Sequence, residues 1–98
     1  MFIVRDIFHL KFGHYKDAKT LLDEANQNGM LPEAQSSRIL TDFTGDAYRL
    51  IFEESHTSLA EYEKSLTESM QKDEWKTWYA RFKQHVDRSH REILKQVM

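Results

Sequence analysis

The sequence contains no cysteine, a single proline and three glycines among its 98 residues. Without cysteine the chain can form neither disulfide bonds nor thiolate zinc sites, and thiol catalysis is excluded. No apolar run approaches the roughly 20 residues that a membrane-spanning helix needs. Near the N-terminus, Arg5 and Asp6 interrupt an apolar stretch, which the apolar region of a signal peptide does not tolerate. We therefore expect a cytoplasmic protein with no membrane partner.

Several motifs of catalytic and binding sites are also missing. There is no P-loop and no GxGxxG fingerprint, and none of the serines lies in the GxSxG motif of hydrolases. The histidines are His9, His14, His56, His85 and His90. No two of them are spaced i and i+4 on a predicted helix, and neither HExxH nor His-x-His occurs. We therefore expect no metal ion and no cofactor.

The composition indicates one small globular domain that covers residues 1–98. Hydrophobic residues make up 40% of the chain and charged residues 31%, unlike a disordered sequence. A domain of this size buries only about two-thirds of its unfolded surface, so pairing with a second copy would add stability. The net charge is −2, but from Lys76 onward six Lys and Arg stand against two Asp and Glu. We interpret this segment as solvated and expect no nucleic-acid partner, because a phosphate-binding face needs denser basic residues.

Residues 2–12 alternate in hydropathy with a period of two, which predicts a β-strand. One predicted face carries Phe2, Val4, Phe8, Leu10 and Phe12, with Asp6 interrupting it. The other face carries Ile3, Arg5, Ile7, His9 and Lys11. After Gly13, the helical spacing of Tyr15, Ala18, Leu22 and Ala25 predicts a helix that ends at Gly29. The segment around Pro32 is then a loop.

Two β-rich segments, SSRILTDF and AYRLIFEE, flank the short sequence TGD and predict a β-hairpin. Gly45 can adopt the positive φ that such a turn requires. Ser58 and Glu61 match a capping box, so a helix should begin at Leu59. The chain should then break near Asp73, with Asp73 as the N-cap of another helix.

Four aromatic residues fall within the segment DEWKTWYARF, at positions i, i+3, i+4 and i+7: Trp75, Trp78, Tyr79 and Phe82. This spacing puts them on one face of a helix. Such a face packs in the core or at the edge of a dimer, and stacking on a ligand is the alternative. We favour core or dimer packing.

The last segment, VDRSHREILKQV, is ambiguous, because its local pattern favours a helix and it alternates poorly as a strand. The order of elements is therefore β-α-β-β-α, followed by a helix and then either a helix or a strand. A β-α-β-β-α-β order is the ferredoxin-like split βαβ motif, an α+β fold. Its helices cover one face of the sheet, so the other face must find water or a partner.

The chain resembles the dimeric α+β barrel proteins, specifically their NIPSNAP-like branch. The resemblance covers nearly the whole chain, in the right order. It is carried by four segments: VRDIFHLKFGHYKDAKTL, TGDAYRLIFEE with SLAEYEKSL, KDEWKTWYARF, and SHREILKQV. One departure is Phe12, where the family usually has proline before the glycine of the turn. Gly13 can form that turn without it.

The resemblance implies a four-stranded antiparallel sheet whose closing strand lies near residues 89–96, against the local helical pattern. It also implies a homodimer in which two such sheets face each other and enclose a lumen. The physical character of the first strand supports this pairing. Its face with Ile3, Arg5, Ile7 and His9 is too apolar to leave in water and too polar for a monomer core.

Four residues are candidates for a ligand site in the lumen: Arg5, His9, Arg49 and Glu53. A buried arginine needs a carboxylate or an anionic ligand. In one interpretation Arg5 or Arg49 pairs with Glu53 or Asp6 in a structural network. In the other, an arginine holds an anion while His9 exchanges a proton near neutral pH. A third possibility is that these side chains face solvent.

The function implied by the resemblance is that of a small dimeric barrel protein that binds a small apolar or anionic ligand between its sheets, or serves as an interaction module. The alternative is an enzyme of the same superfamily, a cofactor-independent monooxygenase or an isomerase, with Arg5 and His9 in its site. A fold shared with enzymes does not transfer their chemistry. Whether the protein is an enzyme therefore remains open at the level of the sequence.

Overall fold

The computed structural model describes all residues, 1–98. In chain order its elements are β1 (Phe2–Leu10), α1 (Tyr15–Gln27), β2 (Ser36–Thr41), β3 (Arg49–His56), α2 (Leu59–Met70), α3 (Asp73–Phe82), the 3₁₀ turn η1 (Lys83–His85) and β4 (Val86–Lys95). None of the helices has the length and apolar character needed to cross a lipid bilayer.

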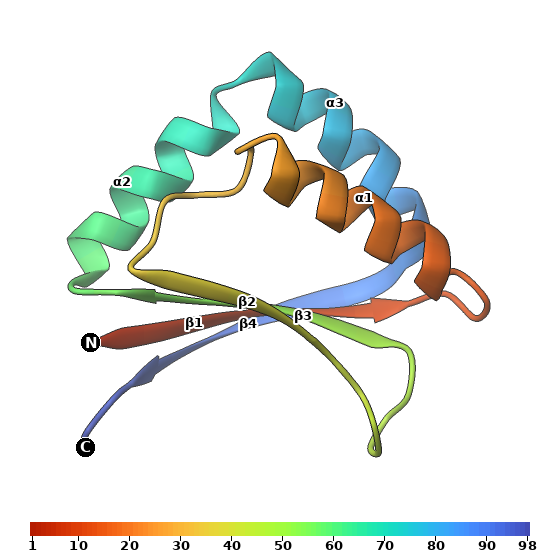
Figure 1. Ribbon diagram of the computed structural model, residues 1–98, viewed down its shortest axis with the longest axis horizontal. Helices are drawn as coiled ribbons and strands as arrows, with labels where there is room; N and C mark the ends of the chain where they lie inside the picture. Colours follow the sequence, from red (N-terminus) through yellow and green to blue (C-terminus); the bar gives the residue numbers. More distant parts are fainter.

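The four strands form one antiparallel sheet in the order β2-β3-β1-β4. This confirms the predicted α+β, ferredoxin-like architecture. All three helices lie on one face of the sheet, and no element covers the opposite face (Figure 1). We call this uncovered side of the sheet the open face. The C-terminus and the loop between β2 and β3 both extend beyond it, away from the helices (Figure 1).

The hydrophobic core lies between the sheet and the pair α1 and α3. Its largest fully buried apolar side chains are Phe82, Leu22, Leu50 and Val4. Trp78 joins α3 to α1, because its indole Nε1 donates a hydrogen bond of 2.7 Å to the carbonyl oxygen of Leu21. These contacts explain why apolar residues recur at helical spacing in both segments.

The predicted helix boundaries are confirmed at two places and corrected at a third. α2 begins at Leu59, with the Ser58 side chain accepting a hydrogen bond from the backbone N–H of Glu61. Gly29 takes a positive φ of 66° just after α1. Asp73 is not an N-cap: Lys72 occupies that position and Asp73 is the first helical residue. There its negative charge still interacts favourably with the positive end of the helix dipole.

Three strand boundaries differ from the prediction. β1 ends at Leu10, after a register shift between His9 and Leu10, and Phe12 is 87% exposed instead of buried. In the hairpin, β2 ends at Thr41 and β3 begins at Arg49, because the turn extends over residues 42–48. Ala47 and Tyr48 both adopt positive φ in that turn, a conformation their residue types do not signal.

The closing segment is a strand, as the resemblance implied, and the local helical pattern was misleading. β4 runs from Val86 to Lys95 and pairs with β1 at the edge of the sheet. Nearly every β4 side chain is exposed in the single chain, so the strand lacks the strong apolar alternation that a half-buried strand shows.

The aromatic cluster of α3 divides into buried and exposed members. Trp78 and Phe82 are core residues, and their rings stack with centroids 4.9 Å apart. Trp75 is partly buried against them. Tyr79 is 45% exposed in the single chain, so it is not a core residue there, and its packing at the edge of a dimer stays a prediction.

Candidate functional site

All four predicted site residues lie on the open face, but they form two separate groups: Arg5 with Glu53, and His9 with Arg49. Across the pairing of β1 and β3, Arg5 faces Glu53 and His9 faces Arg49. Within each strand the two candidates are four residues apart, which is a distance of about 13 Å. The sheet therefore brings each arginine to its cross-strand partner and keeps the two pairs apart.

The first group is a closed network of ion pairs. Arg5 Nε donates a hydrogen bond of 2.6 Å to Glu53 Oε1, and Arg38 of β2 donates to Glu53 Oε2. The Glu53 side chain is only 6% exposed. Although burial opposes ionisation, the two guanidinium groups hold the pKa of Glu53 below its usual range. Arg5 and Glu53 are therefore paired with each other, as the structural interpretation of the sequence expected.

In the second group, His9 and Arg49 contact residues outside the predicted set. Arg49 is held by Asp42 of the hairpin, with Nη2 2.8 Å from Oδ1, and this pair lowers the pKa of Asp42. The sequence suggested Glu53 or Asp6 as the partner of Arg49, but in the structure its partner is Asp42. His9 stacks on His90 of β4 with ring centroids 5.4 Å apart. Burial lowers the pKa of His9, and the neighbouring positive charges, Arg88 first among them, lower it further.

Arg88 completes a basic row at this end of the open face. It faces His9 across the pairing of β1 and β4, and it takes part in no ion pair. We call His9, Arg49, Arg88 and His90 the basic end. Asp42 pairs with Arg49, and Asp46 also acts on His9 and Arg49, so Arg88 is the arginine of the basic end that has no ion-pair partner.

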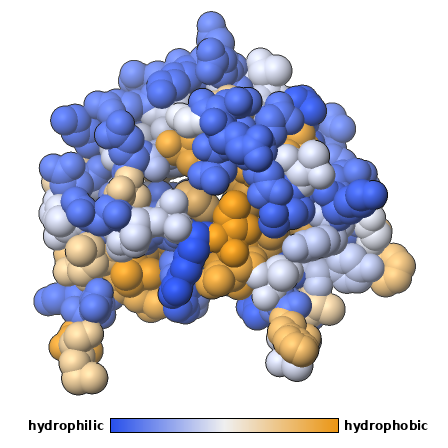
Figure 2. Space-filling model, in the orientation of Figure 1, coloured by the Kyte–Doolittle hydropathy of each residue, from blue (hydrophilic) through white to orange (hydrophobic).

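An apolar row separates the two groups. Cross-strand neighbours Ile7, Ile51 and Leu40 lie in register on the open face. Leu40 is 37% exposed, and Leu94 on β4 is 40% exposed. Figure 2 shows the lower side of the molecule hollowed between two apolar projections, which lie where Figure 1 places the C-terminal end and the β2–β3 loop. Phe43, Val97 and Met98, the large apolar residues of these two segments, are almost fully exposed.

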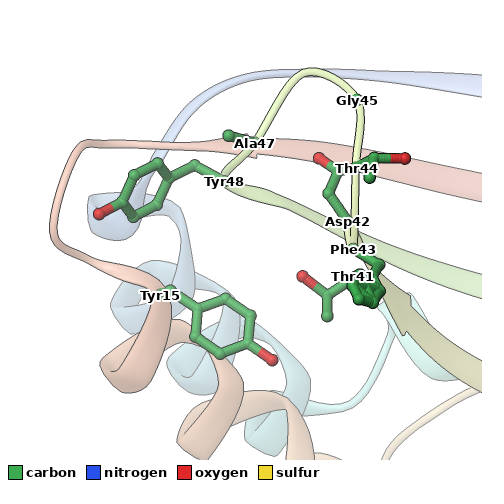
Figure 3. Close-up of a pocket in the computed structure, with 8 residues that line it drawn as sticks. All are labelled: Tyr15, Thr41, Asp42, Phe43, Thr44, Gly45, Ala47 and Tyr48. Atoms are coloured by element: carbon green, nitrogen blue, oxygen red, sulfur yellow. The ribbon is translucent and has the colours of Figure 1, made fainter.

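A pocket of about 470 Å³ lies between the β2–β3 loop and the start of α1. Figure 3 shows Tyr15 and Tyr48 on one side of it and Thr41 and Phe43 on the other. Its single charged residue, Asp42, is already paired with Arg49. The pocket therefore offers aromatic surface and hydroxyl groups but no free charge.

A second polar group lies on the other face of the sheet, beneath α2, and the sequence did not single it out. Glu54, His56 and Tyr62 are 2%, 3% and 7% exposed, respectively. Glu54 Oε2, His56 Nε2 and the Tyr62 hydroxyl have no hydrogen-bond partner. Glu54 Oε2 and His56 Nε2 are 3.6 Å apart, which is too long for a hydrogen bond. We call these three residues the buried triad.

The buried triad adjoins an ion pair that lines a small aromatic cavity. Arg91 Nε lies 2.5 Å from Asp6 Oδ1, and the Arg91 guanidinium carbon lies 5.7 Å from the centre of the Tyr62 ring. Burial, followed by the charge of Asp6, raises the pKa of Glu54 to about 7. Burial also raises the pKa of Tyr62 and lowers that of His56. The cavity, of about 200 Å³, is lined by Asp6, His90, Arg91 and a set of aromatic rings, and no residue of the buried triad lines it. The rings are those of Phe8, Phe52, Trp75, Trp78, Tyr79 and Phe82.

One signal in the sequence could have identified the buried triad. The period of two in β3 puts Glu54 and His56 on the same face as Leu50 and Phe52, the core residues of that strand. A carboxylate and an imidazole on an apolar face are unusual and need a partner. That partner, Tyr62, comes from another element, so its place could not be derived from local spacing.

No three histidine, aspartate or glutamate side chains gather closely enough to hold a metal ion. His14 and His85 form the nearest approach of two histidines, with Nδ1 atoms 3.0 Å apart. They lie at the start of α1 and in η1, away from the basic end.

Solved structures share this fold over nearly the whole chain. An uncharacterised NIPSNAP domain protein from Burkholderia xenovorans superimposes with a TM-score of 0.86 at 8% identity, covering 99% of this chain and 95% of its own. A NIPSNAP family protein from Agrobacterium tumefaciens has a TM-score of 0.81 at 18% identity, covering 97% and 92%. An antibiotic biosynthesis monooxygenase has a TM-score of 0.74 at 14% identity, covering 100% of both chains. No protein-family model and no curated protein sequence matches this chain.

These similarities confirm the resemblance at the level of the fold. The chain has the ferredoxin-like fold that NIPSNAP proteins and the monooxygenase share. At identities below one in five, the shared fold carries no information on activity. Any function must therefore be inferred from this chain's own side chains.

Proposed function

We propose that this protein is a homodimer whose two open faces enclose a binding site for a small anionic ligand at the basic end. The observation that carries the proposal is the row in which His9 lies between Arg49 and Arg88, with Arg49 paired to Asp42 and Arg88 in no ion pair. Arg5 and Glu53 shape the same lumen, but their charges already neutralise each other.

The size and character of the open face support the pairing. The Cα extents of the chain are 36 × 34 × 21 Å, and the view down the shortest axis shows the sheet edge-on (Figure 1). These extents limit the open face to at most about 36 by 21 Å, which is on the order of the ~800 Å² that each partner buries in a standard interface. Exposed Leu40 and Leu94 on the face, and Phe43 beside it, give that interface an apolar component.

The chemistry of the basic end supports an anion. Guanidinium groups and imidazoles donate hydrogen bonds to carboxylate, sulfate or phosphate oxygens. In a lumen closed by a second sheet, positive charges without counter-ions would be costly, and an anion would offset that cost. Burial lowers the pKa of His9, and the positive charges of Arg88 and Arg49 beside it lower that pKa further.

Light scattering tests the pairing. At micromolar concentration we expect about twice the 11.7 kDa mass of the chain. Leu40→Glu places a charge in the apolar row and should give monomers with an unchanged circular dichroism spectrum. Leu59→Glu is the matched control, because Leu59 is exposed to a similar degree, 47%, on α2. A monomeric wild-type protein would remove the lumen and the ligand site with it.

Calorimetric titration with sulfate tests the anion site, since sulfate keeps one charge state near neutral pH. Binding should strengthen as the pH falls, because a bound anion raises the pKa of His9 and favours its charged form. Arg88→Ala should weaken sulfate binding by about tenfold or more. Arg81→Ala removes an arginine from α3 and should leave binding unchanged. Equal affinities for the two variants would contradict the assignment.

The enzymatic alternative with Arg5 and His9 in one site is less well supported. Arg5 is engaged by Glu53, and its Cα lies about 13 Å along β1 from that of His9. A small substrate would have to span both groups and compete with a buried carboxylate. The similarity to a monooxygenase extends to the fold alone.

A further inference from the structure

We propose that helix α2 is a lid over the space between the sheet and the helices. It opens as a unit while the core stays folded, and it closes over an uncharged Glu54, so rising pH opens it. The lid lies on the opposite side of the sheet from the basic end. The proposal therefore depends neither on the homodimer nor on the anion site.

The weak attachment of α2 is the first ground. Its buried residues are Tyr62 and Ser69 alone, and none of its side chains belongs to the main hydrophobic core or packs against it. Leu59 and Met70, at its two ends, are 47% and 51% exposed. No ion pair joins α2 to another element, whereas Trp78 bonds α3 to α1. Segments with few buried apolar contacts open at a lower free energy than the whole domain unfolds.

The polar groups beneath α2 are the second ground. The buried triad has three polar atoms without a hydrogen-bond partner, and two of them, on Glu54 and His56, belong to the sheet. The Tyr62 ring covers them and lies edge-on to the His56 ring, with centroids 5.2 Å apart. Opening α2 admits water to all three atoms, so they regain the hydrogen bonds that they lack in the closed state. The closed lid is therefore opposed by polar groups and favoured by little apolar surface.

Both ends of α2 offer a hinge. Ser58, before the helix, and Lys72, between α2 and α3, have extended backbone with ψ values of 161° and 135°. Changes of φ and ψ at such terminal residues move a helix without unfolding it. Leu66 of α2 lines the aromatic cavity, so this movement opens the cavity to solvent.

The charge of Glu54 sets the direction of the pH dependence. Burial beneath the closed lid raises the pKa of Glu54 to about 7, whereas a carboxyl group in water ionises near 4.5. Opening therefore releases a proton between these values, and the opening constant rises with pH up to about 7. His56, whose pKa burial lowers, favours opening as the pH falls. The charged and titratable groups around this pair come from every neighbouring element: Asp6 of β1, Glu61 and Tyr62 of α2, and Arg91 of β4.

Hydrogen–deuterium exchange of the whole protein tests the lid, with the amides of α1 as the reference for global unfolding. Dividing each exchange rate by its intrinsic value gives the opening constant. At about pH 8 the opening constant of α2 should exceed that of α1 by at least about tenfold. The ratio of the α2 opening constants, wild type over Glu54→Gln, should rise at least about tenfold between about pH 5.5 and about pH 8, because His56 cancels in this ratio. The same ratio for Glu63→Gln, whose side chain is exposed on α2, should stay constant.

A second variant tests the polar groups directly. Tyr62→Phe keeps the ring and removes a hydroxyl that has no partner, so it should lower the α2 opening constant about threefold or more at every pH. Equal opening constants in α1 and α2, a ratio for Glu54→Gln that does not change with pH, or a larger opening constant in Tyr62→Phe overturns the proposal. Arg88→Ala should leave these results unchanged, so the anion site and the lid can fail independently.

Discussion

Glu53 and Glu54 are neighbours in the chain, but their side chains point to opposite faces of β3 and their carboxyl groups ionise differently. Two arginines on the open face hold the pKa of Glu53 below its usual range. Beneath α2, burial raises the pKa of Glu54 to about 7. The stabilising effect of Glu53 is therefore present at neutral pH and lost as the pH falls through its lowered pKa. Glu54 has the opposite effect: because its pKa is raised from 4.5 to about 7, the fold loses stability as the pH rises through that range, and the full cost is present above about pH 7.

Glu54→Gln should stabilise the protein at alkaline pH, because the neutral amide replaces a buried charge. A pKa raised from 4.5 to about 7 corresponds to about 3 kcal/mol at pH values above both. At about pH 5 Glu54 is protonated in the fold but partly ionised in the unfolded chain, so the difference between variant and wild type should fall below about 1 kcal/mol. Urea unfolding at about pH 5 and about pH 8.5 measures this difference in the free energy of unfolding, with Glu63→Gln as the control. His56, whose lowered pKa works in the opposite direction, cancels in the comparison.

A variant less stable than wild type at about pH 8.5 would contradict the prediction and mean that Glu54 has a partner in solution.

We expect Arg5 to stabilise the fold and His9 to contribute to ligand binding without stabilising the fold. Arg5→Ala leaves the buried Glu53 carboxylate with Arg38 alone, and should lower the free energy of unfolding by about 1–2 kcal/mol at neutral pH. The partial exposure of Arg5, 39%, keeps this below the cost of breaking a fully buried pair. His9→Ala should change it by less than about 0.5 kcal/mol. Urea unfolding of both variants tests this, and a larger loss for His9→Ala would make His9 structural.

At the scale of the element, the sequence predicted those segments in which local pattern and tertiary packing agree. The strand at residues 2–10 and the helix from Leu59 follow from alternation and from the capping box of Ser58. The sequence pattern did not predict β4, because nearly all of its side chains are exposed in the single chain and its hydropathy therefore alternates weakly. The buried triad was missed for a related reason, since a Glu and a His on a core face make sense only once α2 brings Tyr62 over them.

In α3, Trp78 is buried and its neighbour Tyr79 is partly exposed. Replacing each by alanine should therefore change the free energy of unfolding by different amounts. Trp78 is 4% exposed, stacks on Phe82 and bonds to Leu21, so Trp78→Ala should lower the free energy of unfolding by about 3–5 kcal/mol. Tyr79→Ala should cost less than about 1 kcal/mol, because the ring is 45% exposed. Chemical denaturation of both variants compares them.

A cost below about 1 kcal/mol for Trp78→Ala would mean that the ring is exposed in solution and that α3 presents a binding surface. Trp78→Phe gives an intermediate case. It keeps an aromatic ring in the core and removes the hydrogen bond to the Leu21 carbonyl, which should cost about 1–3 kcal/mol.

At the scale of the whole molecule, the sheet separates two environments. One side is covered by helices within the same chain and contains the buried triad, while the other side is bare, partly apolar and bordered by exposed Phe43 and Val97. The alternation of β1 predicted that the open face would be unsuited to water. The nature of its cover could not be derived from one chain, because the partner's contacts belong to no local pattern.

If a second copy covers the open face, unfolding should depend on protein concentration, because each dimer that melts gives two chains. A tenfold increase in concentration should raise the midpoint temperature of the wild-type protein by about 2–5 °C. Leu40→Glu should melt at one temperature whatever its concentration, and Leu59→Glu should behave as the wild type. Differential scanning calorimetry over two decades of concentration decides the matter. A concentration-independent wild-type midpoint would mean that the open face is stable in water, and that the charged rows on either side of Ile7 and Ile51 are sufficient to keep it so.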